Sequence, residues 1–254
     1  ITSFILLNII ICHTNANDII CPSLSSSSTT TFDSNPSIIN LQGFDPNGQN
    51  FVEISGVAIS TSQKPASNQG PILFAINDGG GGKRLGVFDA NSGERLLSLR
   101  LESLPSAFDW EDLAIGPCGA NQAGTCLYIP DIGDNTASFS RGRESGRRGV
   151  PYRIYKIREP IVGNFQDNDQ IPTQDIQILE YYSYNHPTSP TTYANCEAFF
   201  VDPKGWGGQI GDLYMVTKWF RNSADLVRVY RIPASAWTMP YFQNGVYSYS
   251  PEVV

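Results

Sequence analysis

Charged residues and histidines are scarce in this sequence of 254 residues. Only 16% of the positions are charged, against about 25% in an average globular protein, and two are histidines. Acidic residues outnumber basic residues by 24 to 17, which gives a formal net charge of −7. A general nucleic-acid-binding protein needs a basic face to meet the phosphates. The composition therefore argues against that class of function.

The sequence also lacks the common signatures of catalysis by a nucleophile or at a phosphate loop. Beyond the first 16 residues the one histidine is His186, next to Pro187, and no G-x-S-x-G motif precedes it. A phosphate-binding loop at 78–83 would need Gly at position 77 and Ser or Thr at position 84, where Asn77 and Arg84 stand. Neither a Ser-His-Asp triad nor a P-loop is indicated.

The apolar run at residues 4–12 is too short for a membrane span, because it has nine residues where a spanning helix needs about 20. It has the length of a signal-peptide core, and Thr14-Asn15-Ala16 follow with small residues at −3 and −1 of a possible cut. We predict a signal peptide at 1–16 and a secreted or extracellular protein; the alternative is a buried first strand. Residues 17–50 are expected to be a leader, low in complexity at 22–36.

Five cysteines agree with an oxidising compartment: Cys12, Cys21, Cys118, Cys126 and Cys196. Removal of the signal peptide leaves four, for which three connectivities are possible. Cys118 and Cys126 flank a turn-like stretch between two expected strands, so we predict a disulfide that closes this loop. Cys21 and Cys196 would then form the remaining pair.

An internal repeat is the most informative feature of the chain. Glycine (23) and proline (17) are frequent, and short apolar segments recur between them in the same order. Sixteen positions separate Glu111 from Leu127 and Glu197 from Leu213. The expected first strands are 54–59, 110–115 and 196–201, the second strands 72–77, 126–131 and 212–217, the third strands 84–89, 152–157 and 227–232, and fourth strands are readable at 95–101 and 175–181.

Units of four antiparallel strands are typical of a β-propeller. We therefore predict an all-β fold, a β-propeller of four-stranded antiparallel blades, over residues 51–254. Closed propellers have four to eight blades, whereas this sequence holds three to four. No initiator Met begins the sequence, and it ends in an expected strand. We expect an amino-terminal fragment of a six-bladed protein.

Three stretches carry a resemblance to a known family: DWEDLA at 109–114, LYIPDIGDN at 127–135 and YRIYKIREP at 152–160. They resemble the "DWED(I/L)A", "LY(I/V)xDIGDN" and "xIYR(V/I)xEP" motifs of largely uncharacterised secreted proteins, which are similar to six-bladed TolB-like and phytase-like propellers. The resemblance covers about 52–233. It implies a propeller architecture, and it implies a calcium ion in the central channel, as in related propeller hydrolases, where the metal polarises a phosphoryl or ester oxygen.

The repeat itself predicts a set of channel-lining residues, because equivalent strand ends converge at the centre of a propeller. Oxygen ligands without His or Cys suit Ca²⁺. We predict metal ligands at Glu111, Asp131, Asp134, Asn135 and Glu197, and further channel-lining residues at Ser55, Asn77, Asp112 and Thr217. The alternative is structural, since Asp and Asn at strand ends commonly bond to the backbone of their own turns.

Two functions follow from these expectations. The first is a secreted or cell-surface binding module, with or without calcium, whose partner is an extracellular protein, a glycan or a small phosphate or ester ligand. The second is a calcium-dependent hydrolase, similar to phytases or lactonases. No convincing catalytic base is visible in the sequence, which favours the binding module.

Overall fold

The computed structural model describes residues 13–15, 18–20, 40–41, 51, 53–63, 69–78, 82–105, 107–119, 122–133, 151–181, 195–205, 209–218, 227–238, 246–248 and 252–253. The chain divides into two compact units, 1–38 and 39–254. In the first unit, β1 (His13–Asn15) pairs antiparallel with β2 (Asp18–Ile20). Within the described ranges, no helix has the length and apolar character needed to cross a membrane.

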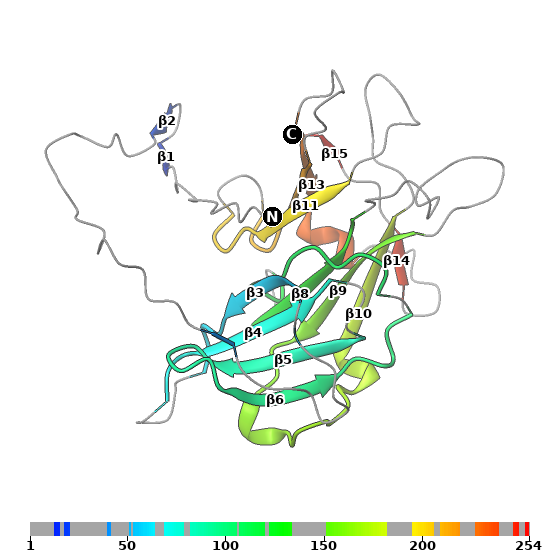
Figure 1. Ribbon diagram of the computed structural model, residues 1–254. Coiled ribbons are helices and arrows are strands. Elements are labelled where there is room, and N and C mark those ends of the chain that lie inside the picture. The colour runs from blue at the N-terminus through cyan, green and yellow to red at the C-terminus, as the bar shows by residue number, and fades with distance from the viewer. Residues whose placement is uncertain are drawn as a thin grey trace, which may run out of the picture. The chain divides into compact units, whose positions relative to one another are not determined.

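The first sheet of the second unit has four antiparallel strands in chain order (Figure 1). Its β4 strand reads ILFAIN and is almost entirely buried, as expected of a run of β-branched and aromatic residues covered on both faces. Asp89 holds the turn after β5, because its carboxylate accepts hydrogen bonds from the backbone N–H groups of Gly70, Asn91 and Ser92 at 2.7, 2.8 and 2.9 Å. The strands are β3 (Ile54–Ile59), β4 (Ile72–Asn77), β5 (Arg84–Asp89) and β6 (Arg95–Arg100).

The second sheet repeats this order with β7, β8, β9 and β10, and β14 adds to β10 in the parallel direction. A disulfide between Cys118 and Cys126 closes the hairpin of β7 and β8, which confirms the predicted pair. The strands are β7 (Ala114–Pro117), β8 (Thr125–Asp131), β9 (Tyr152–Arg158), β10 (Ile176–Tyr181) and β14 (Val246–Ser248), and the 3₁₀ helices η2 (Val162–Asn164) and η3 (Thr173–Asp175) lie between β9 and β10.

The third sheet has the order β11, β12, β13 and β15, again antiparallel. Asp212 precedes β12, is fully buried, and accepts hydrogen bonds from the backbone N–H groups of Gln209 (2.9 Å) and Ala234 (2.7 Å). It thereby ties the start of β12 to the end of β13. The elements are β11 (Cys196–Val201), β12 (Leu213–Thr217), β13 (Val229–Ile232), the 3₁₀ helix η4 (Ala234–Thr238) and β15 (Glu252–Val253).

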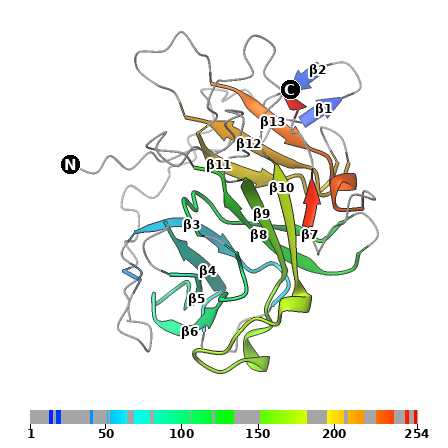
Figure 2. The same ribbon diagram turned by 90° about the vertical axis from the view of Figure 1, so that its right-hand side faces the viewer.

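The first strands of the three sheets lie against one another, and two glycines allow the close approach. A Cβ atom at Gly56 of β3 would lie 2.3 Å from the backbone nitrogen of Leu113, and one at Gly116 of β7 would lie 2.8 Å from Cγ1 of Val201 in β11. Any side chain at these positions would push the sheets apart. The second sheet therefore lies between the other two, as Figure 2 shows.

Each junction between sheets has its own apolar core. The core between the first and second sheets includes Phe74, Leu85, Leu127 and Tyr155. The core between the second and third sheets is rich in aromatic residues, among them Tyr128, Tyr152, Phe199, Tyr230 and Trp237. Burial of side chains of this size supplies the main stabilisation of such a stack.

The all-β prediction with antiparallel four-stranded units is confirmed, and the predicted strands fall within two residues of the observed ones with one exception. The segment predicted at 110–115 becomes strand β7 only at Ala114, and before it Trp110 pairs with Asp131 as an isolated bridge. In this segment a side chain accepts a backbone hydrogen bond, since Leu113 N–H donates to Asp112 Oδ1 at 2.8 Å. A side-chain acceptor therefore replaces part of the expected strand ladder.

Candidate functional site

A β-bulge of one extra residue interrupts β3 and β11 at equivalent places. The extra residue is Ser55 in β3 and Glu197 in β11. A bulge turns its side chain away from the regular alternation, and bulges are frequent beside functional sites. The flanking register pairs are Ile54 with Asn77 and Gly56 with Ile76 in the first sheet, and Cys196 with Thr217 and Ala198 with Val216 in the third.

The second sheet has the same irregularity at Glu111. Trp110 pairs with Asp131 and Ala114 pairs with Tyr128, so residues 111–113 face only two residues of β8. The backbone N–H of Glu111 donates to the carbonyl of Pro130 at 3.3 Å. Glu111 follows the bridging residue directly, as Ser55 and Glu197 do. The three residues that the repeat aligns therefore share one backbone irregularity.

Glu111 lies in an acidic environment. Burial, and after it the neighbouring carboxylates of Glu197, Asp109 and Asp78, together raise the pKa of Glu111 to about 9, while Lys218 opposes them. Each neighbour disfavours a second negative charge at the same place. The three sheets thus bring together an acidic cluster, which we define as Asp78, Asp109, Glu111 and Glu197.

Gly133 provides the space for two of these carboxylates. A Cβ atom at this position would lie 2.1 Å from Oε1 of Glu111 and 2.5 Å from Oδ2 of Asp109. The backbone of Gly133 is held in place by a hydrogen bond from its N–H to the carbonyl of Asp109 at 3.2 Å. Only glycine fits where the backbone approaches the cluster this closely.

Glu197 already has a cation beside it. Lys218 Nζ lies 2.8 Å from Glu197 Oε1, and the same oxygen accepts a hydrogen bond from Nδ2 of the buried Asn195 at 3.0 Å. Lys218 is in turn fixed through its backbone N–H, which donates to the carbonyl of Asn195 at 2.7 Å. Glu197, at one edge of the acidic cluster, therefore already binds the ammonium group of Lys218 and the side-chain amide of Asn195.

Asp131 and Thr217, predicted in the channel, are engaged by the backbone. Asp131 is fully buried, and its two carboxylate oxygens accept hydrogen bonds from the N–H groups of Asp109 (3.1 Å) and Phe108 (3.4 Å). Thr217 Oγ1 accepts one from Arg228 N–H at 2.9 Å. Asp131 thus positions the segment that carries Asp109 in the acidic cluster.

The other predicted residues fall in three places. Asn77 is buried at the end of β4, opposite the bulge that holds Ser55. Asp112 bridges the second and third sheets, because its Oδ2 accepts a hydrogen bond from Phe199 N–H at 2.8 Å. Asp134 and Asn135 lie outside the described residues, as does Cys21.

The donor set has the oxygen chemistry that Ca²⁺ prefers. Nevertheless, in the part of the chain that the structure describes, no three His, Cys, Asp or Glu side chains are arranged to hold a metal ion. The described residues alone therefore do not assemble a calcium site, and calcium at Glu111, Asp131, Asp134, Asn135 and Glu197 stays a prediction.

Sequence reasoning missed two buried charged residues. Glu159 lies at the junction of the first and second sheets, where Ser60 and Thr125 donate hydrogen bonds to its carboxylate, with Ser62 at 2.7 Å and Gln63 at 2.9 Å. Lys156 lies within β9, facing the third sheet. The sequence held one indication of their burial, since both are charged residues within the largely apolar segment 152–160.

Asp109 and Asp78 were also missed as cluster members. Asp78 directly follows the predicted Asn77 and Asp109 lies two positions before the predicted Glu111, and only the fold shows that both interact with Glu111. Comparison of the chain with known protein families and with curated proteins gives no match.

Proposed function

We propose that the three sheets are blades of a β-propeller in a secreted or cell-surface protein, and that the acidic cluster at their bulged strands is a binding site for a positively charged group. The ligand that the geometry favours is a Lys or Arg side chain of an extracellular protein partner. The observation that carries the proposal is the equivalent position of Glu111 and Glu197 next to a backbone irregularity in their sheets, together with the electrostatic interaction between the two carboxyl groups.

A repeated contact between neighbouring sheets supports the propeller. In the first junction, Gly56 faces the backbone nitrogen of Leu113. In the second junction, the equivalent residue, Asp112, accepts a hydrogen bond from the backbone N–H of Phe199, which is equivalent to Leu113. The same position on one sheet thus meets the same position on the next. This is the relation expected for blades that follow one another around an axis.

The uncovered faces of the stack support the same arrangement. Leu113 and Phe199 are 3% and 5% exposed, because the preceding sheet covers them, whereas the equivalent Val57 of β3 is 51% exposed. Ile59 on the same face is 52% exposed, and Phe200 is 44% exposed on the opposite face of the third sheet. In a ring these faces would meet further blades, since exposed apolar patches mark contact surfaces.

The charge of the cluster supports a cationic ligand. Glu197, Asp109 and Asp78 each raise the pKa of Glu111, and the nearby cation Lys218, which pairs with Glu197, lowers it. In addition, within the described residues the buried hydroxyl oxygen of Ser55, on the equivalent bulge, has no hydrogen-bond partner. An ammonium or guanidinium group needs only two or three such oxygens, which the cluster offers, whereas Ca²⁺ takes six to eight.

Thermal unfolding of the full chain with added arginine amide, with added CaCl₂ and with a chelator tests the proposal. Arginine amide is expected to raise the unfolding temperature of the wild type, because a ligand that binds only the folded state stabilises it. The rise should disappear in Glu111→Gln and persist in Glu94→Gln, an exposed glutamate far along the first sheet. No rise with arginine amide would contradict the proposed ligand.

The calcium arm separates the alternatives. Suppose that CaCl₂ raises the unfolding temperature of the wild type but not of Glu111→Gln, and that arginine amide has no effect. The ligand of the acidic cluster would then be a metal ion and not an organic cation. Turnover of a phosphomonoester or a lactone by the calcium-loaded wild type, lost in the same variant, would favour the calcium-dependent hydrolase over the binding module.

A further inference from the structure

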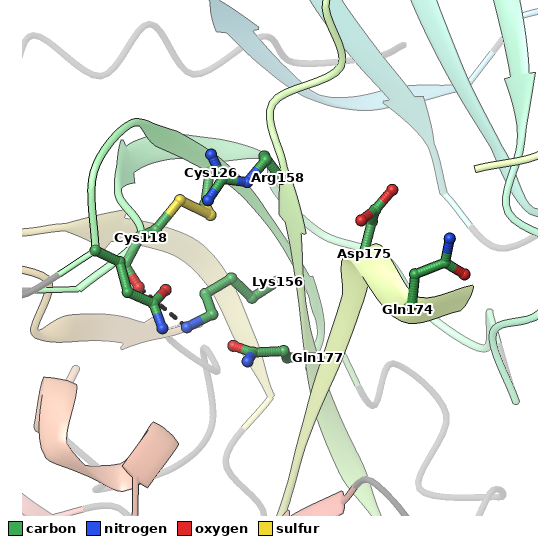
Figure 3. A pocket seen from close by; sticks show the side chains of 8 residues that line it. Cys118, Cys126, Lys156, Arg158, Gln174, Asp175 and Gln177 are labelled. Carbon is green, nitrogen blue, oxygen red and sulfur yellow. Dashed lines mark hydrogen bonds between the residues drawn. A yellow bond between two sulfur atoms is a disulfide. The ribbon is translucent and has the colours of Figure 1, made fainter. Parts of the chain in front are cut away.

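Two adjoining cavities flank Lys156 on the face of the second sheet that turns toward η4. One has a volume of about 340 Å³ and the other about 230 Å³. Both are lined by Cys118, Gln122 and Lys156. Arg158 and Gln177 line the larger cavity, drawn in Figure 3. Together the two cavities fall in the size range of small-molecule sites, about 300–1,000 Å³.

Lys156 is the unusual residue of this region, because it is a lysine and only 3% of its surface is exposed. Its Nζ donates a hydrogen bond to the carbonyl oxygen of Cys118 at 3.0 Å and lies 4.4 Å from the centre of the Trp237 ring. An ammonium group has three donors, and the carbonyl uses one. No carboxylate pairs with Lys156 anywhere in the described ranges.

A buried ammonium with so few partners is costly to the fold. The cation–π contact with Trp237 offsets part of the desolvation cost. Burial of an ion without a counter-charge nevertheless lowers the stability of the fold by roughly several kcal/mol. Burial accordingly lowers the pKa of Lys156 to about 8, which leaves it mostly protonated at neutral pH. A purely structural role would be filled more favourably by Met, which has nearly the length of Lys and no charge, so the charge points to a ligand.

The groups around Lys156 complete a site for an anion. Gln177 is its register partner on β10, and Figure 3 shows both side chains extending toward the disulfide side of the cavity. The Gln177 side-chain oxygen is buried and, among the described residues, has no hydrogen-bond partner. Arg158, opposite Cys126 in the register, adds a second positive charge at the rim. Asp175 contributes the carboxylate among the lining residues and lies on the far side in Figure 3.

The smaller cavity has a different chemistry. Trp237 and Ala234 line it together with the polar residues Gln209, Ser235 and Thr238. A ligand that reaches from one cavity to the other therefore meets a cation and an amide at one end and an aromatic ring at the other.

We propose that Lys156 binds the carboxylate of a small organic acid, whose hydrocarbon part occupies the cavity beside Trp237. The carboxylate accepts hydrogen bonds from the two remaining donors of Nζ, and the Gln177 amide lies beside it. The site is separate from the acidic cluster, uses none of its residues, and would hold whether or not that cluster binds a cation.

Isothermal titration calorimetry of the full chain with hexanoate, acetate and inorganic phosphate tests this proposal. Hexanoate is expected to bind more tightly than acetate, because only hexanoate reaches the second cavity. Lys156→Met, which keeps the length of the side chain and removes its charge, should weaken hexanoate binding at least tenfold. Lys204→Met, a lysine on the exposed turn after β11, is the matched control and should bind as the wild type does.

A second variant keeps the test decisive if Lys156→Met fails to fold. Gln177→Leu replaces a buried oxygen without a partner by carbon, so it should fold at least as stably as the wild type, yet it should weaken hexanoate binding severalfold. Three results would overturn the proposal: no heat with hexanoate, equal affinity of wild type and both variants, or binding of phosphate in preference to both carboxylates.

Discussion

The carboxylate of Asp112 joins the second sheet to the first strand of the third, because its Oδ2 accepts a hydrogen bond from the backbone N–H of Phe199 at 2.8 Å. Its other oxygen, Oδ1, accepts one from Leu113 N–H at 2.8 Å. Burial raises the pKa of Asp112 to about 6 even though both hydrogen bonds oppose the shift. The fold thus tolerates a costly buried acid in order to satisfy two backbone donors at a junction between sheets.

Replacement of Asp112 by Ala should destabilise the protein markedly. Both backbone N–H groups lose their acceptor, and a buried donor without a partner costs about 1–3 kcal/mol. Urea unfolding should show a lower midpoint with an unchanged slope. Glu94→Ala, on an exposed edge, is the control and should shift the free energy of unfolding by less than about 0.5 kcal/mol. Equal midpoints for Asp112→Ala and the wild type would contradict the bridging role.

Equivalent apolar positions on the first strands should differ sharply in their effect on stability. Leu113→Ala empties a buried site and should cost about 2–5 kcal/mol. Val57→Ala, at the equivalent but half-exposed position of β3, should cost less than about 1 kcal/mol. The free energies of unfolding of the two variants check this difference. A large loss for Val57→Ala would mean that the outer face of β3 is covered in solution, for instance by a second copy of the chain.

The strand repeat could be predicted because each central strand is a run of apolar residues between turns, a signal that is local in the sequence. The disulfide followed from two cysteines on either side of one hairpin. The bulges could not be predicted, since a bulge is a mismatch of register between two strands and neither strand alone reveals it. The alignment of Ser55, Glu111 and Glu197 was correct, but its structural meaning came from their pairing with the neighbouring strands.

The sequence also left the roles of individual charges undecided. Asp131 resembles a ligand in the sequence, yet its oxygens accept backbone hydrogen bonds from Phe108 and Asp109. Lys156 lies in the strand YRIYKIR, where three charged residues stand among apolar ones and fall on both faces of the strand, so the pattern does not show which of them is buried. Packing of sheets on both faces buries Lys156 all the same. Burial on two faces depends on neighbouring sheets, which a single strand does not specify.

Glu159 should make the stability of the protein depend on pH in the acidic range. Burial alone would raise the pKa of Glu159, but side-chain hydrogen bonds from Ser60, Thr125, Gln63 and Ser62 outweigh it and lower the pKa. The folded state therefore favours the charged form, and the resulting stability is present above the unfolded pKa of about 4.3 and is lost as the pH falls through the lower folded value.

Glu159→Gln should remove that contribution. The loss relative to the wild type should reach about 1–3 kcal/mol above pH 5, because hydrogen bonds to a charged acceptor are lost, and it should shrink steadily below pH 4. Urea midpoints of both proteins between pH 3 and pH 7 measure it. A difference that stays constant over this range would show that the charge of Glu159 plays no part.

Loss of the disulfide should weaken both the fold and the proposed organic-acid site. The bridge joins residues eight positions apart, and closing a loop of this length in the unfolded chain is worth about 2–3 kcal/mol. Because the Cys118 carbonyl accepts the Lys156 hydrogen bond, the double variant Cys118→Ser, Cys126→Ser should also bind hexanoate less tightly. Thermal unfolding and calorimetry test the two effects separately. Unchanged hexanoate affinity in a folded double variant would argue that the loop does not position Lys156.

Glu111 should give the opposite pH dependence to Glu159. Because burial and neighbouring carboxylates raise the pKa of Glu111 to about 9, the folded state holds a proton that the unfolded state releases near pH 4.3. The stability of the wild type relative to Glu111→Gln should therefore be highest in acid, fall as the pH rises above about 4.5, and level off above about pH 9. Urea midpoints of the two proteins from pH 4 to pH 10 measure this difference. A positive ligand at the acidic cluster should make this stability difference depend less on pH, since the ligand compensates the negative charge that forms when Glu111 loses its proton. A stability difference that rises with pH would contradict the arrangement of carboxylates around Glu111.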